Sequence, residues 1–252
     1  MKLIHNARMG TSIHRWYWKT FLLDILFPPY CLGCGSLGTA FCAICISRIP
    51  LSETGCLLCG ARNETGKPCA SCRQRLPFLR AIYWATSYDH PFVQEAIARY
   101  KYRGDRSLAL PLASLIVSFL KKQTQGNVFC IPPNSVLLPL PLHKRKQRER
   151  GFNQSELLAH ALAEKIHIPT LPPPALLRTL YTSPQAAQSK ELRKENVENA
   201  FVVPVSSEYI VKGKVIVLVD DVATTGNTLS AAAVALKKAG AKKVLGIVVA
   251  RG

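Results

Sequence analysis

The chain of 252 residues is poor in acidic residues and lacks the commonest nucleotide-binding motif. No G-x-x-x-x-G-K-S/T segment occurs, so the usual P-loop for nucleotide phosphates is excluded. Its 15 Asp and Glu residues stand against 33 Lys and Arg residues, which gives a formal net charge of +18. This excess favours a polyanionic partner, either a phosphorylated metabolite, a nucleic acid or an anionic lipid. A solvated basic surface without a dedicated partner is the alternative.

Long apolar runs are also missing from the sequence. The apolar stretch at residues 16–27 is about a dozen residues long, too short to span a bilayer. Lys19 and Asp24 interrupt it, and no small-residue cleavage site of a secretory signal follows. We expect a cytoplasmic protein in which residues 17–26 form an amphipathic helix that ends at Pro28 and caps the following module. Attachment of this helix to a membrane surface is the alternative.

Cysteine is abundant, and its spacing indicates a metal site. Two C-x-x-C turns complete a tetrahedral Cys₄ site for Zn²⁺, because each turn points two thiolates at one centre. Disulfides and redox pairs are disfavoured, because there is no secretion signal and no thioredoxin-like context. We therefore expect two structural zinc ions, which supply folding energy to a segment with little apolar core. Eight of the nine cysteines make four C-x-x-C pairs: Cys31 and Cys34, Cys42 and Cys45, Cys56 and Cys59, and Cys69 and Cys72.

The sequence shows four C-x-x-C turns, but it does not by itself decide which two turns share a zinc ion. Sequential sites, at residues 31–45 and 56–72, need intervening loops of only seven and nine residues and are preferred. A cross-braced arrangement stays open. Cys130 stands outside the pairs, and we expect it to be a small buried hydrophobic residue.

A phosphate-sugar site is indicated near the C-terminus by the segment VIVLVDDVATTGNTLS at residues 215–230. The valine-rich run 215–219 predicts a strand buried on both faces, and residues 229–239 predict a helix. Between them, backbone N–H groups and the helix dipole can bind a phosphate at the carboxyl end of a parallel strand. The two carboxylates can accept hydrogen bonds from sugar hydroxyls or reach a hydrated Mg²⁺. The alternative is an acidic turn with a threonine N-cap. The candidate binding residues are Asp220, Asp221, Ala223, Thr224, Thr225, Gly226, Asn227 and Thr228.

A second candidate region is the basic segment at residues 139–155, PLPLHKRKQRERGFNQS. A strand leading into a basic loop would aim its cations at the ligand edge of a sheet, where arginine can clamp pyrophosphate or nucleic-acid phosphates. A solvated basic loop is the alternative. Asn153 is expected to be an N-cap, and His143 a hydrogen-bonded structural residue rather than a catalytic base. The candidate cations are Lys144, Arg145, Lys146, Arg148 and Arg150.

The remaining pattern predicts an α/β fold with a sheet that is parallel at least in its centre. We expect further strands at 81–88, 135–140, 200–203 and 244–250, and further helices at 92–103, 108–122 and 153–166. Residues 73–77 link the two modules. The polar segment 178–201 is either a flexible loop that closes over a ligand or a surface helix around 191–199.

These motifs carry a family resemblance. Residues 220–228, an acid pair at the end of an apolar strand followed by Thr-Thr-Gly-x-Thr, resemble the phosphoribosyl pyrophosphate (PRPP) signature of type I phosphoribosyltransferases. The order of all these motifs along the chain resembles that of the ComF/GntX family of competence-associated bacterial proteins. That order is the four C-x-x-C pairs, K-Y-x-G-D at 101–105, R-G-F-N-Q-S at 150–155, T-x-x-Q at 182–185, R-x-x-N at 193–196, A-F at 200–201 and the acid-pair segment.

The resemblance implies a mostly parallel phosphoribosyltransferase-like sheet with helices on both faces at 78–252. It is preceded by a double zinc ribbon at 31–75 and the N-terminal helix or cap at 1–30. It further implies PRPP with Mg²⁺ as ligand, with the ribose hydroxyls on Asp220 and Asp221 and the 5′-phosphate on residues 224–228. No residue is identified as a catalytic nucleophile.

Three functions are consistent with this resemblance. The first is a PRPP-binding or nucleotide-binding accessory protein that also binds single-stranded DNA in natural competence or the use of extracellular DNA. Its candidate protein partner is a helicase or translocation component of the competence machinery. The second is an active phosphoribosyltransferase that stabilises the departing pyrophosphate and an oxocarbenium-like sugar while an unidentified base or amine attacks. The third is a regulator that senses PRPP without turnover. The fold alone does not decide among them.

Overall fold

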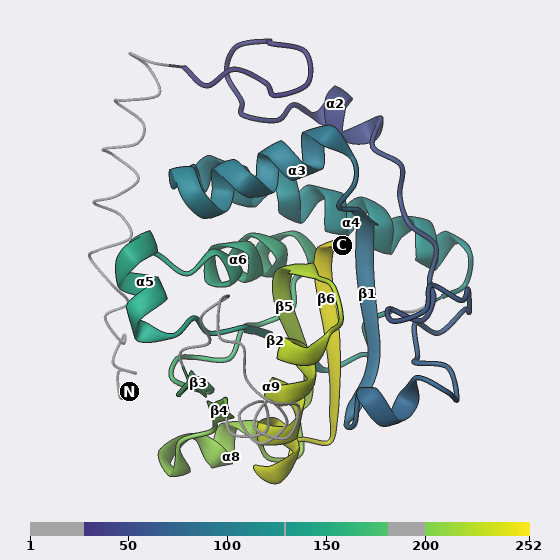
Figure 1. Ribbon diagram of the computed structural model, residues 1–252, viewed down its shortest axis with the longest axis vertical. Helices are drawn as coiled ribbons and strands as arrows, with labels where there is room; N and C mark the ends of the chain where they lie inside the picture. Colours follow the sequence, from purple (N-terminus) through teal and green to yellow (C-terminus); the bar gives the residue numbers. More distant parts are fainter. Residues whose placement is uncertain (1–27, 129, 181–199) are drawn as a thin grey trace, which may run out of the picture.

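The structure is a computed structural model that describes residues 28–128, 130–180 and 200–252 (Figure 1). The helix expected at 17–26 and the motif positions at 182–196 lie outside these described residues. Among the described residues, no helix is both long enough and apolar enough to cross a bilayer.

A parallel sheet of four strands forms the centre of the fold, as the sequence predicted (Figure 1). Its outer strands lie early in the chain, whereas its inner strands lie near the C-terminus. In order across the sheet the strands are β1 (Leu79–Ser87), β6 (Lys243–Arg251), β5 (Val215–Ala223) and β2 (Ser135–Pro139).

The acid pair lies inside strand β5, which corrects the expectation that the strand ends at Val219. Residues 216–219 are at most 1% exposed, as a strand covered on both faces should be. Strand β2 stops pairing with β5 at Val219, but β6 continues to pair with it at Asp220, Val222 and Ala223. The backbone of β5 therefore stays extended past the point where its β2 neighbour ends. This leaves the acid pair at the carboxyl edge of the sheet.

Helices cover both faces of the sheet, again as predicted. One face carries α3 (Pro91–Ala98), α4 (Ala109–Gln125) and α6 (Gln154–Ile166), whose apolar side chains share a core with Tyr83, Val217 and Ile247. The other face carries α9 (Asn227–Lys238) and the short α8 (Glu208–Val211), which share a second core with Trp84 and Leu218.

The shorter elements lie outside the central sheet. The expected helix at 92–103 is α3 followed by a π-helical turn, η2, and it ends at Gly104 as predicted. The expected strand at 200–203 is β4, which pairs with β3 in a small antiparallel sheet rather than joining the central one. The short elements are α2 (Ala43–Ser47), η1 (Arg73–Arg75), η2 (Arg99–Arg103), η3 (Arg106–Leu108), α5 (Lys144–Arg150), β3 (Leu177–Arg178), β4 (Phe201–Val202) and η4 (Val205–Ser207).

Main-chain hydrogen bonds from outside the sheet reach both of its outer strands. On β1, the cysteine-rich segment donates from Ser52 N to Ala85 O at 2.8 Å, and Gly66 O accepts from Ile82 N at 3.1 Å. On β2, Leu137 N donates to Pro169 O and Leu137 O accepts from Leu171 N, each at 2.8 Å. The cysteine-rich segment at residues 31–72 and the proline-rich segment at residues 169–174 therefore flank the sheet.

Candidate phosphate-sugar site and cysteine clusters

The eight paired cysteines gather into two groups of four, and the pairing is sequential. Within each group, at residues 31–45 and 56–72, the four sulfur atoms lie within 4.8 Å of one another. Cys34 Sγ lies 3.8 Å from Cys42 Sγ, and Cys59 Sγ lies 3.7 Å from Cys69 Sγ. A tetrahedral zinc ion with Zn–S bonds of about 2.3 Å separates its sulfur ligands by about 3.8 Å. Both groups therefore fit a structural zinc ion. Cys130 is buried away from them, as predicted.

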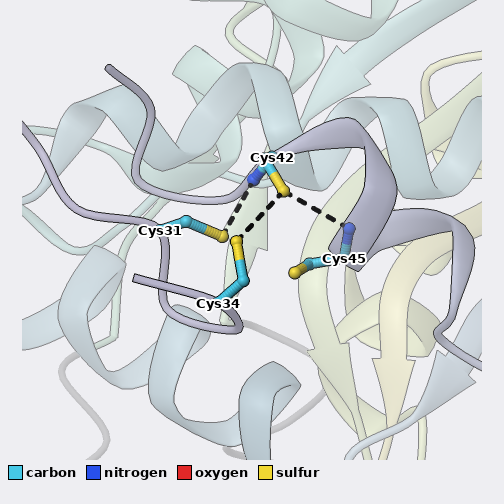
Figure 2. A group of neighbouring side chains, drawn as sticks. All are labelled: Cys31, Cys34, Cys42 and Cys45. Carbon is cyan, nitrogen blue, oxygen red and sulfur yellow. Dashed lines mark hydrogen bonds between the residues drawn. The ribbon is translucent and has the colours of Figure 1, made fainter. Parts of the chain in front are cut away.

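Backbone N–H groups and a glycine shape the first group, which Figure 2 shows converging from two turns. Cys42 N donates to Cys31 Sγ at 3.3 Å, and Cys45 N donates to Cys42 Sγ at 3.4 Å. A Cβ at Gly33 would lie 2.6 Å from Cys45 Sγ, so a side chain there would enter the space between the thiols. In the second group, a hydrogen bond from Ser71 lowers the pKa of Cys69 and favours the thiolate that a metal binds.

The acid pair at the end of β5 is held by groups from two other elements. Asp220 Oδ1 accepts hydrogen bonds from Ser155 Oγ at 2.8 Å and from the Asp221 N–H at 2.9 Å. Asp221 is 2% exposed, and its Oδ1 lies 2.9 Å from Lys101 Nζ. Its Oδ2 is buried without a hydrogen-bond partner among the described residues. A buried carboxylate oxygen in this state is costly, so Asp221 is a candidate ligand-binding residue.

Electrostatics at the pair leave one carboxyl group near its titration point at neutral pH. Desolvation, and next the charge of Asp221, raise the pKa of Asp220 to about 7, while Lys101 opposes the rise. Desolvation lowers the pKa of Lys101, but the charge and hydrogen bond of Asp221 and the charge of Asp220 together outweigh it, so the pKa is raised and the lysine stays charged. An added cation or hydroxyl donor would therefore favour the fully ionised pair.

The candidate phosphate loop, at residues 224–228, comes directly after strand β5 and its acid pair. Thr224 and Thr225 are exposed, and Asn227 and Thr228 are exposed in the first turn of α9 rather than in the loop as expected. Gly226 has a φ of 68°, a left-handed conformation that glycine adopts without strain. The loop therefore presents hydroxyl groups at the N-terminus of a 12-residue helix, where the dipole favours an anion.

Gly226 also lets the loop pack closely against apolar side chains behind it. A Cβ there would meet Leu57 Cδ2 at 2.9 Å, Ile82 Cδ1 at 3.1 Å and Leu76 Cδ2 at 3.2 Å. Leu57 directly follows Cys56, so the second cysteine group packs against the phosphate loop. No sequence pattern could have indicated this contact, because the residues are far apart in the chain.

The basic segment is a helix, α5, which corrects the prediction of a loop. His143 Nδ1 accepts from Arg145 N at 3.2 Å and caps the start, as its expected structural role requires. Gly151 ends the helix in the left-handed conformation, and Arg145 pairs with Glu149 one turn away. The segment is rich in residues with high helix propensity, so local preference and capping both favour the helix.

The five candidate cations do not act as one cluster, because α5 divides them between two faces. Lys146 and Arg150 are partly buried, whereas Lys144, Arg145 and Arg148 are exposed. Desolvation, and next the charge of Arg178, lower the pKa of Lys146, so this lysine lies near the site. Arg150 lies 5.6 Å from the Tyr102 ring centroid and also donates to Gln154.

Asn153 caps α6 as predicted, by accepting from Ser155 N at 3.1 Å.

Three site residues were not identified as such from the sequence. Lys101 and Ser155 belong to motifs quoted above for their pattern, but only the π-helical turn and the start of α6 place them against the acid pair. Arg178 is the third: the charge of Asp220 acts on its pKa, which desolvation lowers.

A cavity of about 650 Å³ adjoins the site. It lies between the end of β2, α5, the start of α6 and the proline-rich segment. Apolar leucine and proline side chains line it together with Asn153, Glu156 and Arg178. Its size and mixed lining are typical of small-molecule sites.

Comparisons with known proteins agree with this geometry. A phosphoribosyl transferase domain matches residues 153–252, and a double zinc ribbon domain matches residues 22–73. The fold and the cysteine groups thus define a phosphoribosyltransferase-like protein with an N-terminal double zinc ribbon.

Similar proteins of known name identify the family within this class. The chain is 30% identical over 204 residues to the DNA utilization protein YhgH of Escherichia coli strain K12, covering 81% of this chain and 86% of the relative. It is 29% identical over 219 residues to Competence protein F of Haemophilus influenzae, covering 85% and 93%. It is 30% identical over 207 residues to Competence protein ComFC of Bacillus subtilis, covering 79% and 78%. The chain belongs to the ComF/GntX family.

Proposed function

We propose that this chain is an accessory protein of natural competence or DNA utilisation that binds PRPP with Mg²⁺ at residues 220–228 and also binds single-stranded DNA. The buried, unpartnered Asp221 Oδ2 carries the first part of this proposal, because Asp221 comes three residues before a hydroxyl-lined loop at a helix N-terminus. The names of the competence and DNA-utilisation relatives support the second part.

Different residues of the chain would bind different parts of PRPP. Asp220 and Asp221 would accept hydrogen bonds from the two ribose hydroxyls, and Lys101 would orient Asp221 through their ion pair. Thr224, Thr225 and the N–H groups that follow would bind the 5′-phosphate. Lys146 and Arg150 would face the pyrophosphate. Mg²⁺ would supply neutralisation of the pyrophosphate charge.

Calorimetry with PRPP and Mg²⁺ tests the ligand. Asp221→Asn should weaken binding roughly ten- to hundredfold, because a charge-assisted hydrogen bond contributes about 1.5–3 kcal/mol. Glu164→Gln removes the same charge from an exposed position on α6 and should leave affinity unchanged. Equal affinity in wild type and Asp221→Asn would place PRPP elsewhere.

An active phosphoribosyltransferase is the second candidate, and the cavity of about 650 Å³ beside Arg178 favours it. In this case the cavity would hold the base or amine acceptor next to the sugar. Incubation with PRPP, Mg²⁺ and a panel of bases, with pyrophosphate release as the readout, separates turnover from binding. Pyrophosphate release that depends on one acceptor and is lost in Asp221→Asn supports the enzyme. Binding without release under every condition supports the accessory role.

A further inference from the structure

A second basic region lies at the opposite edge of the sheet from the acid pair. A groove of about 270 Å³ forms where β1 and β6 begin, beside η1 and the end of α9. In Figure 1 this edge is at the bottom, whereas the chain's C-terminus marks the other edge. Its lining contains no acidic residue and six basic ones: Lys67, Arg73, Arg80, Lys237, Lys242 and Lys243.

Ion pairs do not neutralise the positive charge of this groove in the part of the chain that the structure describes. Among the described residues, none of the six basic side chains forms an ion pair. Lys237 Nζ donates to Ala241 O at 2.7 Å and to Lys242 O at 3.1 Å, which fixes one cation at the end of α9. Arg73, Arg80, Lys242 and Lys243 are exposed. A row of unpaired cations with no acid among them is complementary to a phosphate backbone.

An exposed aromatic ring lies among these cations. Phe78 is 57% exposed and has a φ of 68°, a conformation that bulky side chains rarely adopt. Its neighbours explain how the conformation is held, because Leu76 is 1% exposed and Leu79 is 5% exposed. Both flanks of Phe78 are therefore anchored in the core while its ring stays in the solvent. Strained residues of this kind are concentrated at binding sites.

We propose that this groove is a binding site for single-stranded nucleic acid, with phosphates on the cations and a base stacked on Phe78. Stacking on an exposed ring requires an unpaired base, which favours a single strand over a duplex. The inference rests on the proposed function, and it gives the DNA a site other than α5.

The two sites are far enough apart to be filled together. Strand β6 runs from the groove to the carboxyl edge in nine residues, which spans roughly 26 Å at about 3.3 Å per residue. DNA in the groove therefore leaves the acid pair and the phosphate loop accessible to PRPP.

Fluorescence anisotropy of a labelled oligothymidylate, measured over a range of salt concentrations, tests the groove. The triple variant Arg80→Ala, Lys242→Ala and Lys243→Ala should bind at least tenfold more weakly, and its log–log salt slope should fall by about two, at about 0.7 per phosphate contact. PRPP affinity should not change. The control triple Arg48→Ala, Lys121→Ala and Lys165→Ala removes the same charge from exposed positions elsewhere and should keep the wild-type slope.

Phe78 has a separate test. Phe78→Ala should weaken oligonucleotide binding about tenfold with an unchanged salt slope, because stacking releases no counterions. Phe78→Tyr keeps the ring and should keep the affinity. Thermal unfolding of both variants verifies that the fold is intact. An intact Phe78→Ala variant with wild-type affinity would overturn the stacking role.

The remaining outcomes separate this inference from the proposed function. Wild-type protein that retains no oligonucleotide at low salt would overturn both the DNA function and the groove. Wild-type binding that survives the groove triple but is lost in Arg145→Ala, Lys146→Ala and Arg148→Ala would move the DNA to α5, which overturns the groove alone. Equal binding of duplex and single strand would show a general polyanion surface and overturn the single-strand assignment.

Discussion

The two cysteine groups have the same ligand pattern but different neighbours. The first group adjoins Phe41, Ile46 and Ile49, which share a core with residues of α3 and α4. The second adjoins Leu57 and Leu76, which pack against Gly226 of the phosphate loop. The same set of four cysteines therefore has two different surroundings: one group packs against a helical face, and the other packs against the candidate ligand site.

The largest expected effect comes from removing one zinc ligand from each group at matched positions. Cys34→Ser and Cys59→Ser replace exposed ligands at the same place in the pattern. Elemental analysis should give about two zinc ions per wild-type chain and about one in each variant. PRPP affinity should fall about tenfold or more in Cys59→Ser but stay nearly constant in Cys34→Ser. Equal losses in both variants would remove the distinction between the groups.

The next effect concerns the close approach at Gly226. Gly226→Val should cost about 1–2 kcal/mol for the left-handed backbone and about 1–3 kcal/mol more for overpacking against Leu57, with weaker PRPP binding. Gly213→Val is the matched control, because Gly213 has a φ of 74° and no described atom within 4 Å of a Cβ. Urea unfolding of both variants separates backbone strain from packing. If the two destabilisations are equal, the contact with the second group contributes nothing.

A comparable effect on stability, with a smaller effect on PRPP binding, should follow from opening a space behind the loop. Leu57→Ala and Ile49→Ala each truncate a side chain that is at most 3% exposed, so both should lose about 2–5 kcal/mol of unfolding free energy. Only Leu57→Ala should also weaken PRPP binding, measured by calorimetry at a temperature where both variants are folded. A comparable loss of affinity in Ile49→Ala would mean that stability alone controls the site.

The smallest effect is on pH dependence, which tests the acid pair separately from the cysteine groups. Because the pKa of Asp220 is raised to about 7, its carboxyl group gains a proton as the pH falls through neutrality. PRPP affinity should therefore rise between about pH 6 and pH 8, and Asp220→Asn should lose this dependence. Unfolding free energy should change in the opposite direction: the contribution of Asp220 is present at low pH and is lost as the pH rises through 7. Cys34→Ser and Cys59→Ser should leave the midpoint unchanged.

Local patterns in the sequence identified most of the fold. The valine-rich run before the acid pair, the hydroxyl loop and the alanine-rich helix predicted the strand, loop and helix of the site, because each signal is contained in a few consecutive residues. The C-x-x-C spacing predicted both cysteine groups for the same reason. Asn153 was recognisable as a cap from its position before an apolar helix.

The parts that were not predicted depend on contacts between distant residues. The high charge of the basic segment at α5 indicates a loop, whereas its helix propensity and the left-handed cap at Gly151 favour the helix that forms. Lys101 reaches Asp221 only because α3 ends in a π-helical turn, which no periodicity indicates. The contact between Leu57 and Gly226 joins residues in different modules, so it exists only in the folded chain.

The main-chain hydrogen bonds along both outer strands limit how this protein can assemble. Ala85 O on β1 and both backbone groups of Leu137 on β2 already have partners from outside the sheet. An incoming peptide or a second copy cannot extend the sheet there by adding a strand, which is a common route to peptide capture and to uncontrolled association. At these positions of the sheet, a protein partner would therefore have to be recognised through side chains rather than through strand addition.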